Sequence, residues 1–391
     1  MIQWRERRAF VIAGALFLVL AGAVPLTLYH PRVDPNESSI ADTLPSELNN
    51  EEFWKLVEEF SEPNGYFRSD NLLSNESGLQ DVIPKIKERI RPGGVYVGVG
   101  PEQNFTYILA FEPKISFIVD IRRLNMLEHL LYKALFELST DRADFVSRLF
   151  SRPRPKGLPS TGTSAEALFS AYSAVPPDNI YFESNLDAVN QHLSETHGFR
   201  LSDDDLLQIR YVLTNFFQEG PELSYSFLGS YYQGTLGMPT YRELMTATDG
   251  DGRNWGFLAT EDHFERIQEM QRKNLIIPLV GDFAGTKTLR AVGRYMAERH
   301  ARLSVFYTSN VEMYLFQQGD DWKHFYENVR ILPTNSSSSF IRFAAGRGRR
   351  FGYNSGYFSM RSQMWSPVRD VVDAVRTRRV DDYSGVLGLS E

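Results

Sequence analysis

Two short apolar runs, each with a distinctive end, constrain the fold of this chain more than any other feature. The run Val95–Gly100 ends in glycines at Gly98 and Gly100, and the run Ile115–Asp120 ends in an acid. An amphipathic helix is expected after the second run, because Leu127, Leu131 and Leu138 belong to a set of leucines at helical spacing. Strand, glycine-rich turn, strand and helix in this order are typical of an open α/β sheet. The sequence therefore predicts the α/β fold class.

The same pattern returns in the C-terminal half of the chain. Thr260 is a candidate N-cap, and a strand over 275–280 stops at Gly281-Asp282. A helix is expected over about 286–299, and a further strand over 303–307 leads to Asn310. Two strand–helix blocks of the same style therefore flank a middle portion of different character.

That middle portion, about 151–258, begins with several prolines and glycines and continues with helices and a tyrosine-rich segment. We interpret it as a helical insertion into the sheet domain. The expected organisation is a membrane helix at 1–29, a polar tether at 30–49, an α/β domain at 50–345 and a basic tail with a short helix at 346–391. The helix of the tail is expected to begin with Ser366 as its cap and Pro367 at its first position.

The N-terminus predicts a membrane anchor. Residues 9–29 carry no charge, and Arg5, Arg7 and Arg8 precede them. Such a run is long enough to cross a hydrocarbon core of about 30 Å as a helix. The arginines favour a cytoplasmic N-terminus with the main domain outside the cytoplasm. A cleaved signal peptide is the alternative, because Ala21-Gly22-Ala23 offers a cleavage site, although the apolar run continues beyond it.

Composition excludes several classes of protein. The chain has no Cys, which excludes disulfides, Cys-ligated zinc, iron–sulfur clusters and thiol nucleophiles. With 42 basic and 49 acidic side chains it is mildly acidic, so no nucleic-acid partner is expected. A hydrophobic fraction of 42% is enough to fill a sizeable core and excludes wholesale disorder.

The candidate ligand site lies at the ends of the predicted strands. Gly98 and Gly100 would let a ligand approach the backbone closely, and Asp120, at the end of the next strand, could accept hydrogen bonds from a ribose diol. A structural turn with a surface aspartate is the alternative. Because ligands gather at the carboxyl ends of parallel strands, Gly98, Asp120, Asp282 and Asn310 are expected to converge on one crevice.

The runs V-Y-V-G-V-G-P-E-Q-N-F and F-I-V-D-I-R-R resemble the first two cofactor motifs of class I S-adenosylmethionine-dependent methyltransferases. More closely, 95–152 together with 282–285 and 309–312 resembles an uncharacterised bacterial family with a methyltransferase-like fold, and this likeness covers about 50 to 345. The resemblance implies a Rossmann-like sheet with S-adenosylmethionine as cofactor and methyl transfer to an unknown small molecule. Catalytic candidates are Asp282 and Asn310, and the cofactor candidates are Gly98, Gly100, Glu102, Gln103, Asn104 and Asp120.

Two positions depart from the methyltransferase pattern. Val97 stands where these enzymes usually carry an acid, and Glu102 replaces the third glycine. The alternative hypothesis is therefore a non-catalytic, extracytoplasmic ligand-binding or scaffold module on the same fold, which would bind an unknown small molecule or glycan.

No metal is expected from the sequence. His192 and His197 are five positions apart on a predicted helix, so they are expected to point to different faces. The run 249–254 is expected to be a Gly/Asp turn rather than a calcium loop, because Arg253 and Thr260 stand where ligands are needed.

Overall fold

We describe the protein from a computed structural model, which places residues 41–159, 161–225, 238–346 and 360–391. The expected membrane helix at residues 9–29 lies outside these ranges. Within them, no helix has the length and apolar character needed to cross a bilayer.

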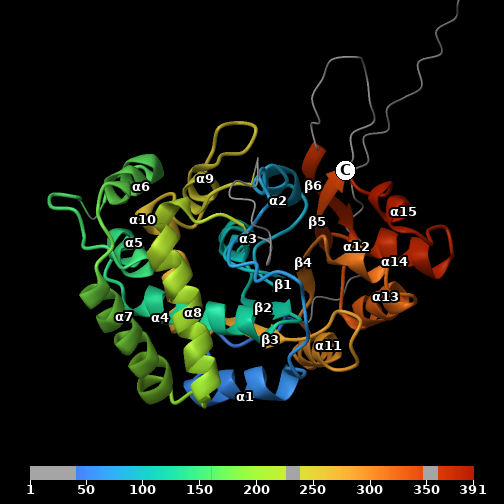
Figure 1. Ribbon diagram of the computed structural model, residues 1–391. Helices are drawn as coiled ribbons and strands as arrows, with labels where there is room; N and C mark the ends of the chain where they lie inside the picture. The colour runs from blue at the N-terminus through green and yellow to red at the C-terminus, as the bar shows by residue number, and fades with distance from the viewer. Residues whose placement is uncertain (1–40, 160, 226–237, 347–359) are drawn as a thin grey trace, which may run out of the picture. The chain divides into compact units, whose positions relative to one another are not determined.

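Six strands form one sheet in the order β3-β2-β1-β4-β5-β6 (Figure 1). All neighbours pair in parallel except β5 and β6, which are antiparallel. The strands are β1 (Val95–Gly98), β2 (Ile115–Asp120), β3 (Ile276–Val280), β4 (Leu303–Ser309), β5 (Ser339–Gly346) and β6 (Met360–Pro367). This order is that of Rossmann-like sheets, with the chain reversing direction across the sheet between β1 and β4. The α/β fold class is thus confirmed.

Helices make up most of the remaining described structure. Those that follow or precede the strands are α1 (Asn50–Phe60), α2 (Ile83–Lys87), α3 (Gln103–Phe111), α4 (Arg123–Leu138), α5 (Arg142–Phe150), α10 (Glu261–Arg272), α11 (Thr288–Glu298), α12 (Val311–Leu315), α13 (Asp321–Ile331), α14 (Val368–Arg376) and α15 (Tyr383–Leu387). Those of the middle portion are α6 (Ala165–Ser173), α7 (Asn179–Gln191), α8 (Asp203–Glu219) and α9 (Tyr241–Thr246). The middle portion is therefore helical, as the sequence predicts.

Two adjacent residues of β4 show that helices cover both faces of the sheet. Phe306 packs against Phe325 of α13, with ring centroids 5.9 Å apart, whereas Tyr307 packs against Tyr107 of α3 at 5.0 Å. Successive side chains of a strand point to opposite faces, so α3 and α13 lie on opposite faces. The helix α4 packs beside α3 through an aromatic cluster that includes Phe105, while α11 packs against α13.

Helix α1 begins where its sequence signal places it. Asn49 accepts a hydrogen bond from Glu52 N, and the Glu52 side chain accepts one from Asn49 N. This capping box satisfies two backbone donors that the first turn of a helix otherwise leaves unpaired. Phe53 and Val57 on the buried face then fix α1 against the domain.

The described part of the predicted tether, 41–49, lies against the domain. Thr43 N donates to Arg299 O over 2.9 Å, and Leu48 N donates to Lys273 O over 3.0 Å. The side chains of Leu44 and Leu48 pack against the core. The ordered domain therefore begins before Asn50, the boundary expected from the sequence.

The predicted C-terminal tail is also part of the domain. Strand β6 pairs with β5 along its whole length, and α14 buries Val368, Val371 and Ala374. Ser366 lies in β6 instead of capping a helix, and its hydroxyl accepts a hydrogen bond from Arg342. Helix α14 consequently begins one residue later than predicted, after Pro367.

Candidate functional site

A cavity of about 370 Å³ lies at the carboxyl ends of the parallel strands. Its lining includes Gly100 after β1, Asp120 at the end of β2, Asp282 after β3 and Asn310 after β4. The segment between α1 and α2 completes the wall and contributes Glu76. This is the crevice in which open α/β sheets bind their ligands, next to the point where the strand order reverses.

The residues proposed from the sequence divide into two groups. Those that line the cavity are Gly100, Gln103, Asp120, Asp282 and Asn310. The other three, Gly98, Glu102 and Asn104, are not part of the lining. These three residues instead pack against or bond to the loop that follows β1, and this loop lines the cavity.

Gly98 and Gly100 are glycines for different reasons. A Cβ atom on Gly98 would collide with the side chains of Asn104 and Tyr96, so this position requires close packing. Gly100 has a φ of 78°, in the left-handed region of backbone conformation that residues other than glycine rarely adopt. The backbone at Gly100 therefore reaches the cavity without a side chain.

Asn104 fixes the loop after β1 through hydrogen bonds to its backbone. Its Nδ2 donates to the carbonyl oxygens of Val99, Gly100 and Pro101, over 3.0, 3.0 and 2.8 Å. Its Oδ1 accepts a hydrogen bond of 2.8 Å from Tyr96 Oη. The carbonyl groups of this loop are thereby turned toward the protein interior.

Glu102 is buried beneath the same loop. Its Oε1 accepts a hydrogen bond of 3.1 Å from Ser74 N, and its Oε2 has no hydrogen-bond partner among the described residues. Burial raises the pKa of Glu102 to about 7, despite the backbone hydrogen bonds that lower it. Burial and the charge of Glu102 also raise the pKa of Glu128 on α4. Two buried carboxyl groups therefore lie behind the cavity and favour their neutral forms.

Asp120 is paired with Arg122. Asp120 Oδ1 accepts hydrogen bonds from Arg122 N (2.9 Å) and Arg122 Nε (3.0 Å), and Oδ2 accepts one from Arg122 Nη2 (3.0 Å). Arg122 Nη1 donates to the carbonyl oxygens of Ser69 and Asp70. Among the cavity-lining residues that the structure places, Arg122 is the only basic one, and its guanidinium is committed to these partners.

Asp282 and Glu76 add two further carboxyl groups to the lining. Asp282 Oδ1 accepts a hydrogen bond of 2.8 Å from Ala284 N, and burial raises the pKa of Asp282. Burial also raises the pKa of Glu76, whose carboxyl accepts hydrogen bonds from Ser309 and from Gln363 of β6. The polar part of the cavity is therefore rich in acids.

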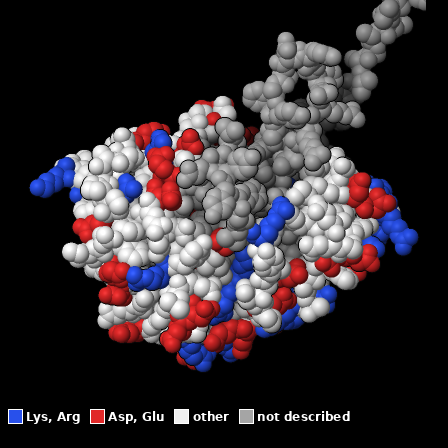
Figure 2. Space-filling view, in the orientation of Figure 1, with Lys and Arg blue, Asp and Glu red and all other residues white. Residues whose placement is uncertain are grey.

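The rest of the lining is largely apolar and aromatic, and it includes Tyr66, Phe67, Tyr314 and Phe343. Phe67 and Tyr314 form an edge-to-face pair with ring centroids 5.2 Å apart. A site with an apolar wall and a few polar groups is typical of small-molecule binding. On the face drawn in Figure 2, basic and acidic side chains lie interspersed rather than gathered by sign.

Sequence reasoning missed Glu76, because the segment between α1 and α2 has no periodic pattern that could place it at the site. Arg122 lies inside the quoted motif F-I-V-D-I-R-R, but the motif assigns it no role. Glu312, two residues after Asn310, does not line the cavity. It is fully buried and pairs with Arg342 of β5 over 2.5 Å.

The run 249–254, which was compared with a calcium-binding loop in the sequence analysis, forms a turn around the side chain of Asp249. Asp249 Oδ1 accepts hydrogen bonds from Asp251 N and Arg253 N, and Oδ2 accepts one of 2.7 Å from Trp255 Nε1. Both carboxylate oxygens thus serve the loop itself.

A family model described as Domain of unknown function (DUF7790) matches residues 72–158 and 201–384. These ranges contain all six strands, β6 and α14 included, and leave out 159–200 of the helical middle portion. A search of curated proteins found no match.

Proposed function

We propose a function for this chain, which belongs to the DUF7790 family of unknown function: it is a methyltransferase-like protein whose cavity binds S-adenosylmethionine. The observation that carries the proposal is the charge of the cavity lining. Among the described lining residues, Glu76, Asp120 and Asp282 contribute carboxyl groups, while the one basic group, Arg122, is paired with Asp120. Such a lining favours a ligand with positive charge, such as a sulfonium and an ammonium group, over a nucleotide phosphate.

The loop after β1 argues in the same direction. Nucleotide phosphates are commonly bound by free N–H groups at a helix N-terminus that follows a glycine-rich turn. Here Pro101 has no N–H group, and the carboxyl of Glu102 is buried at the start of α3. Both features disfavour a group with net negative charge, such as a phosphate, at this position, whereas the amino-acid end of S-adenosylmethionine carries an ammonium group beside its carboxylate. Because Glu102 does not line the cavity, it leaves room for the amino-acid end of S-adenosylmethionine near Gly100.

Asp120 keeps the capacity to bind a ribose hydroxyl. A carboxylate oxygen has about two lone-pair sites. Arg122 occupies both sites of Oδ1, but it donates only one hydrogen bond to Oδ2. The remaining site on Oδ2 can accept a hydroxyl proton, while Phe67 and Tyr314 offer ring surface for a base.

Asp282 is the candidate proton acceptor for the transfer step. Its raised pKa makes it a better base than an ordinary aspartate, and Asn310, which lines the same cavity, is a candidate for orienting the acceptor. S-adenosylmethionine supplies an electrophilic methyl group when bound. A hydroxyl or amine nucleophile would lose its proton to Asp282 as the new bond to the methyl carbon forms and the carbon–sulfur bond breaks.

Calorimetric titration of the purified full-length chain tests the proposal. We expect S-adenosylmethionine to bind and ATP to bind far more weakly. Asp120→Asn should lower the affinity roughly tenfold to a hundredfold, because it weakens one hydrogen bond to a charged group. The exposed Asp187→Asn is the matched control and should change nothing. The absence of heat and of a thermal shift with S-adenosylmethionine at about 1 mM would refute the binding.

The second candidate is a non-catalytic ligand-binding module outside the cytoplasm. The pairing of Asp120 with Arg122 favours it, since the protein itself occupies most of the group that would otherwise hold a ribose. The anchor expected at residues 9–29 would also place the domain where S-adenosylmethionine is scarce. This candidate predicts that Asp282→Asn leaves binding of the natural ligand unchanged and that no methylated product forms.

A further inference from the structure

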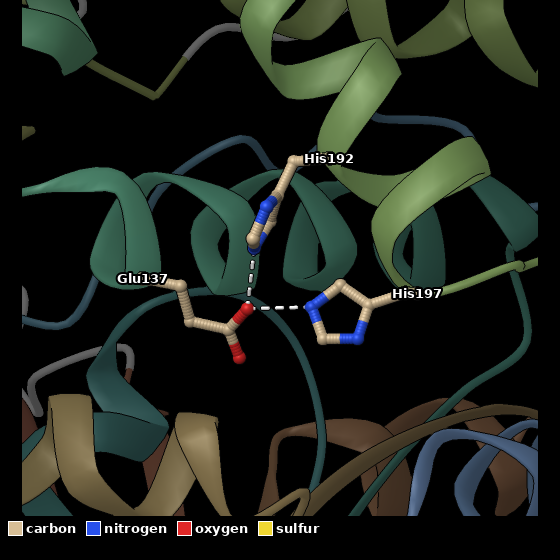
Figure 3. A group of neighbouring side chains, drawn as sticks. All are labelled: Glu137, His192 and His197. Atoms are coloured by element: carbon tan, nitrogen blue, oxygen red, sulfur yellow. Dashed lines mark hydrogen bonds and ion pairs between the residues drawn. The ribbon is translucent and has the colours of Figure 1, made fainter.

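Three side chains outside the cavity converge on one point (Figure 3). Glu137 comes from the last turn of α4, and His192 and His197 come from the segment that follows α7. His192 Nε2 lies 2.6 Å from Glu137 Oε2, and His197 Nε2 lies 2.5 Å from the same oxygen. All three side chains are largely buried, with exposed fractions of 7% for Glu137, 17% for His192 and 8% for His197.

The sequence-based expectation that the two histidines point to different faces is wrong. In an α-helix each residue turns the chain by about 100°, so positions five apart differ by about 140°. The chain over His192–Thr196 instead forms a π-helical turn, in which His197 N donates to His192 O over 3.0 Å. A π-helical turn has one more residue than an α-helical one, and it therefore brings positions five apart to the same side.

The hydrogen bonds around His197 fix which of its nitrogens carries a lone pair. His197 Nδ1 lies 2.9 Å from Asn50 Oδ1. Asn50 presents its oxygen there because the same oxygen accepts a hydrogen bond from Asn274 Nδ2, while Asn50 Nδ2 donates to Thr196 O. Asn274 Nδ2 is in turn assigned as a donor by its bond to Leu48 O. His197 Nδ1 must therefore carry the proton, which leaves the lone pair of neutral His197 on Nε2.

That lone pair is aimed at a carboxylate oxygen, and the two atoms repel unless a cation lies between them. The carboxylate of Glu137 is oriented to bind such a cation. Lys133 Nζ donates to its other oxygen, Oε1, over 2.7 Å, and Oε2 is left to face the histidines. The ammonium group of Lys133 favours the ionised carboxylate, which is the form that binds a cation.

We propose that Glu137, His192 and His197 bind a divalent transition-metal ion of the zinc type. Two imidazole nitrogens and one carboxylate oxygen are a recognised ligand set for such ions, with a fourth position left for water. The ligand atoms lie within 4.8 Å of one another, so small side-chain rotations bring them to coordination distance. The contact of His197 Nδ1 with Asn50 is the outer hydrogen bond that metal-binding histidines usually make.

The site joins three parts of the fold. Glu137 lies on α4, the histidines lie in the segment that follows α7, and Asn50 is the first residue of α1. The two histidines fall within 159–200, outside the ranges that the family model matches. The ion would therefore fasten the helical middle portion to the sheet domain of this chain, away from the cavity and independent of its ligand.

Titration of the full-length chain with Zn²⁺ after removal of metal by a chelator tests the proposal. We expect one Zn²⁺ ion per chain and a higher melting temperature with the ion bound. Co²⁺ should give the visible absorption of a tetrahedral site without any thiolate band, since the chain has no Cys. Glu137→Gln and His192→Gln should each abolish the one-to-one binding.

Two further variants make the test specific. Asn50→Ala should keep the stoichiometry and lower the affinity about 10- to 100-fold, as is typical when an outer partner of a ligand is removed. His324→Gln, which removes an exposed histidine of α13, should leave Zn²⁺ binding unchanged. If Zn²⁺ fails to bind, or if His192→Gln leaves the binding intact, the proposal is wrong. If Zn²⁺ fails to bind, the contact between His197 Nε2 and Glu137 Oε2 is a hydrogen bond and not part of a metal site.

Discussion

Glu102 is the buried carboxyl group whose ionisation should be easiest to detect as a change in stability. Its pKa is raised from 4.5 to about 7 by burial, so the folded protein keeps the proton between these values while the unfolded chain loses it. Stability must then fall as pH rises from 4.5 to 7, because the unfolded state binds fewer protons in this window, and the loss is complete above pH 7. At about 1.4 kcal/mol for each pH unit, the loss from Glu102 is about 3 kcal/mol.

Replacement of Glu102 by Gln should remove this loss. The amide oxygen can still accept the hydrogen bond from Ser74 N, and the amide is neutral at every pH. We expect Glu102→Gln to be more stable than the wild type by about 3 kcal/mol at pH 8, and the gap should almost vanish at pH 4.5. Glu76 and Glu128 titrate in both proteins, but the charge of Glu102, which helps to raise the pKa of Glu128, is absent from Glu102→Gln, so this coupling is part of the measured difference.

Urea unfolding of both proteins at pH 4.5 and pH 8, analysed by linear extrapolation, measures the gap. Glu166→Gln on α6 is the matched control, because Glu166 is exposed and its replacement should have the same small effect at both pH values. A gap that is equal at the two pH values, or no gap at pH 8, would show that Glu102 is not held in a neutral form by burial.

Two further predictions concern other buried groups. Glu312→Gln should destabilise the protein by about 3–5 kcal/mol, because it leaves the guanidinium of Arg342 buried without its partner. Thermal or urea unfolding measures this loss, and a cost below about 1 kcal/mol would contradict it. His129 should remain neutral in the folded protein at pH 5.5, since burial lowers its pKa to about 4. Stability should therefore fall as pH decreases from 6.5 to 4, where the unfolded chain binds the proton first. Titration of the His129 ring by NMR follows the protonation directly, and a midpoint near 6.5 would contradict the assignment.

The sheet was largely predictable because its strands are continuous apolar runs with clear ends. The run Ile115–Asp120 matches β2 at both bounds, since buried parallel strands read as unbroken β-branched and aromatic segments. Neither β5 nor β6 was predicted. The sequence of β6, M-R-S-Q-M-W-S-P, is mostly polar, and this strand joins the sheet through its pairing with β5. Strand pairing between distant segments is not visible in a local pattern.

The candidate site was predictable to the extent that it depends on strand ends. Asp120, Asp282 and Asn310 could be placed together, because residues that follow parallel strands meet at one edge of a sheet. Glu76 could not be placed, since it lies outside the helices and strands. Glu102 follows the glycine turn as expected, yet its side chain points into the protein, where Ser74 N provides a partner.

The proposed metal site was not predicted, because the sequence analysis assumed a regular α-helix between His192 and His197. A regular α-helix would have separated His192 from His197, and the local sequence gives no sign that the turn between them contains an extra residue. The residues that contact the histidines lie far away along the chain: Glu137 is 55 positions from His192, and Asn50 is 147 positions from His197.

The hydrogen bonds that Asn104 makes to three successive carbonyl groups have a consequence for ligand selection. A loop fixed in this way is already in one conformation before a ligand arrives, so binding there requires little further ordering. Preorganisation of this kind favours high affinity for a ligand of matching shape. It also means that the loop cannot adjust to a larger or differently shaped molecule, which would be rejected by steric clash. Selectivity at this end of the cavity should therefore arise from rigidity and not from induced fit.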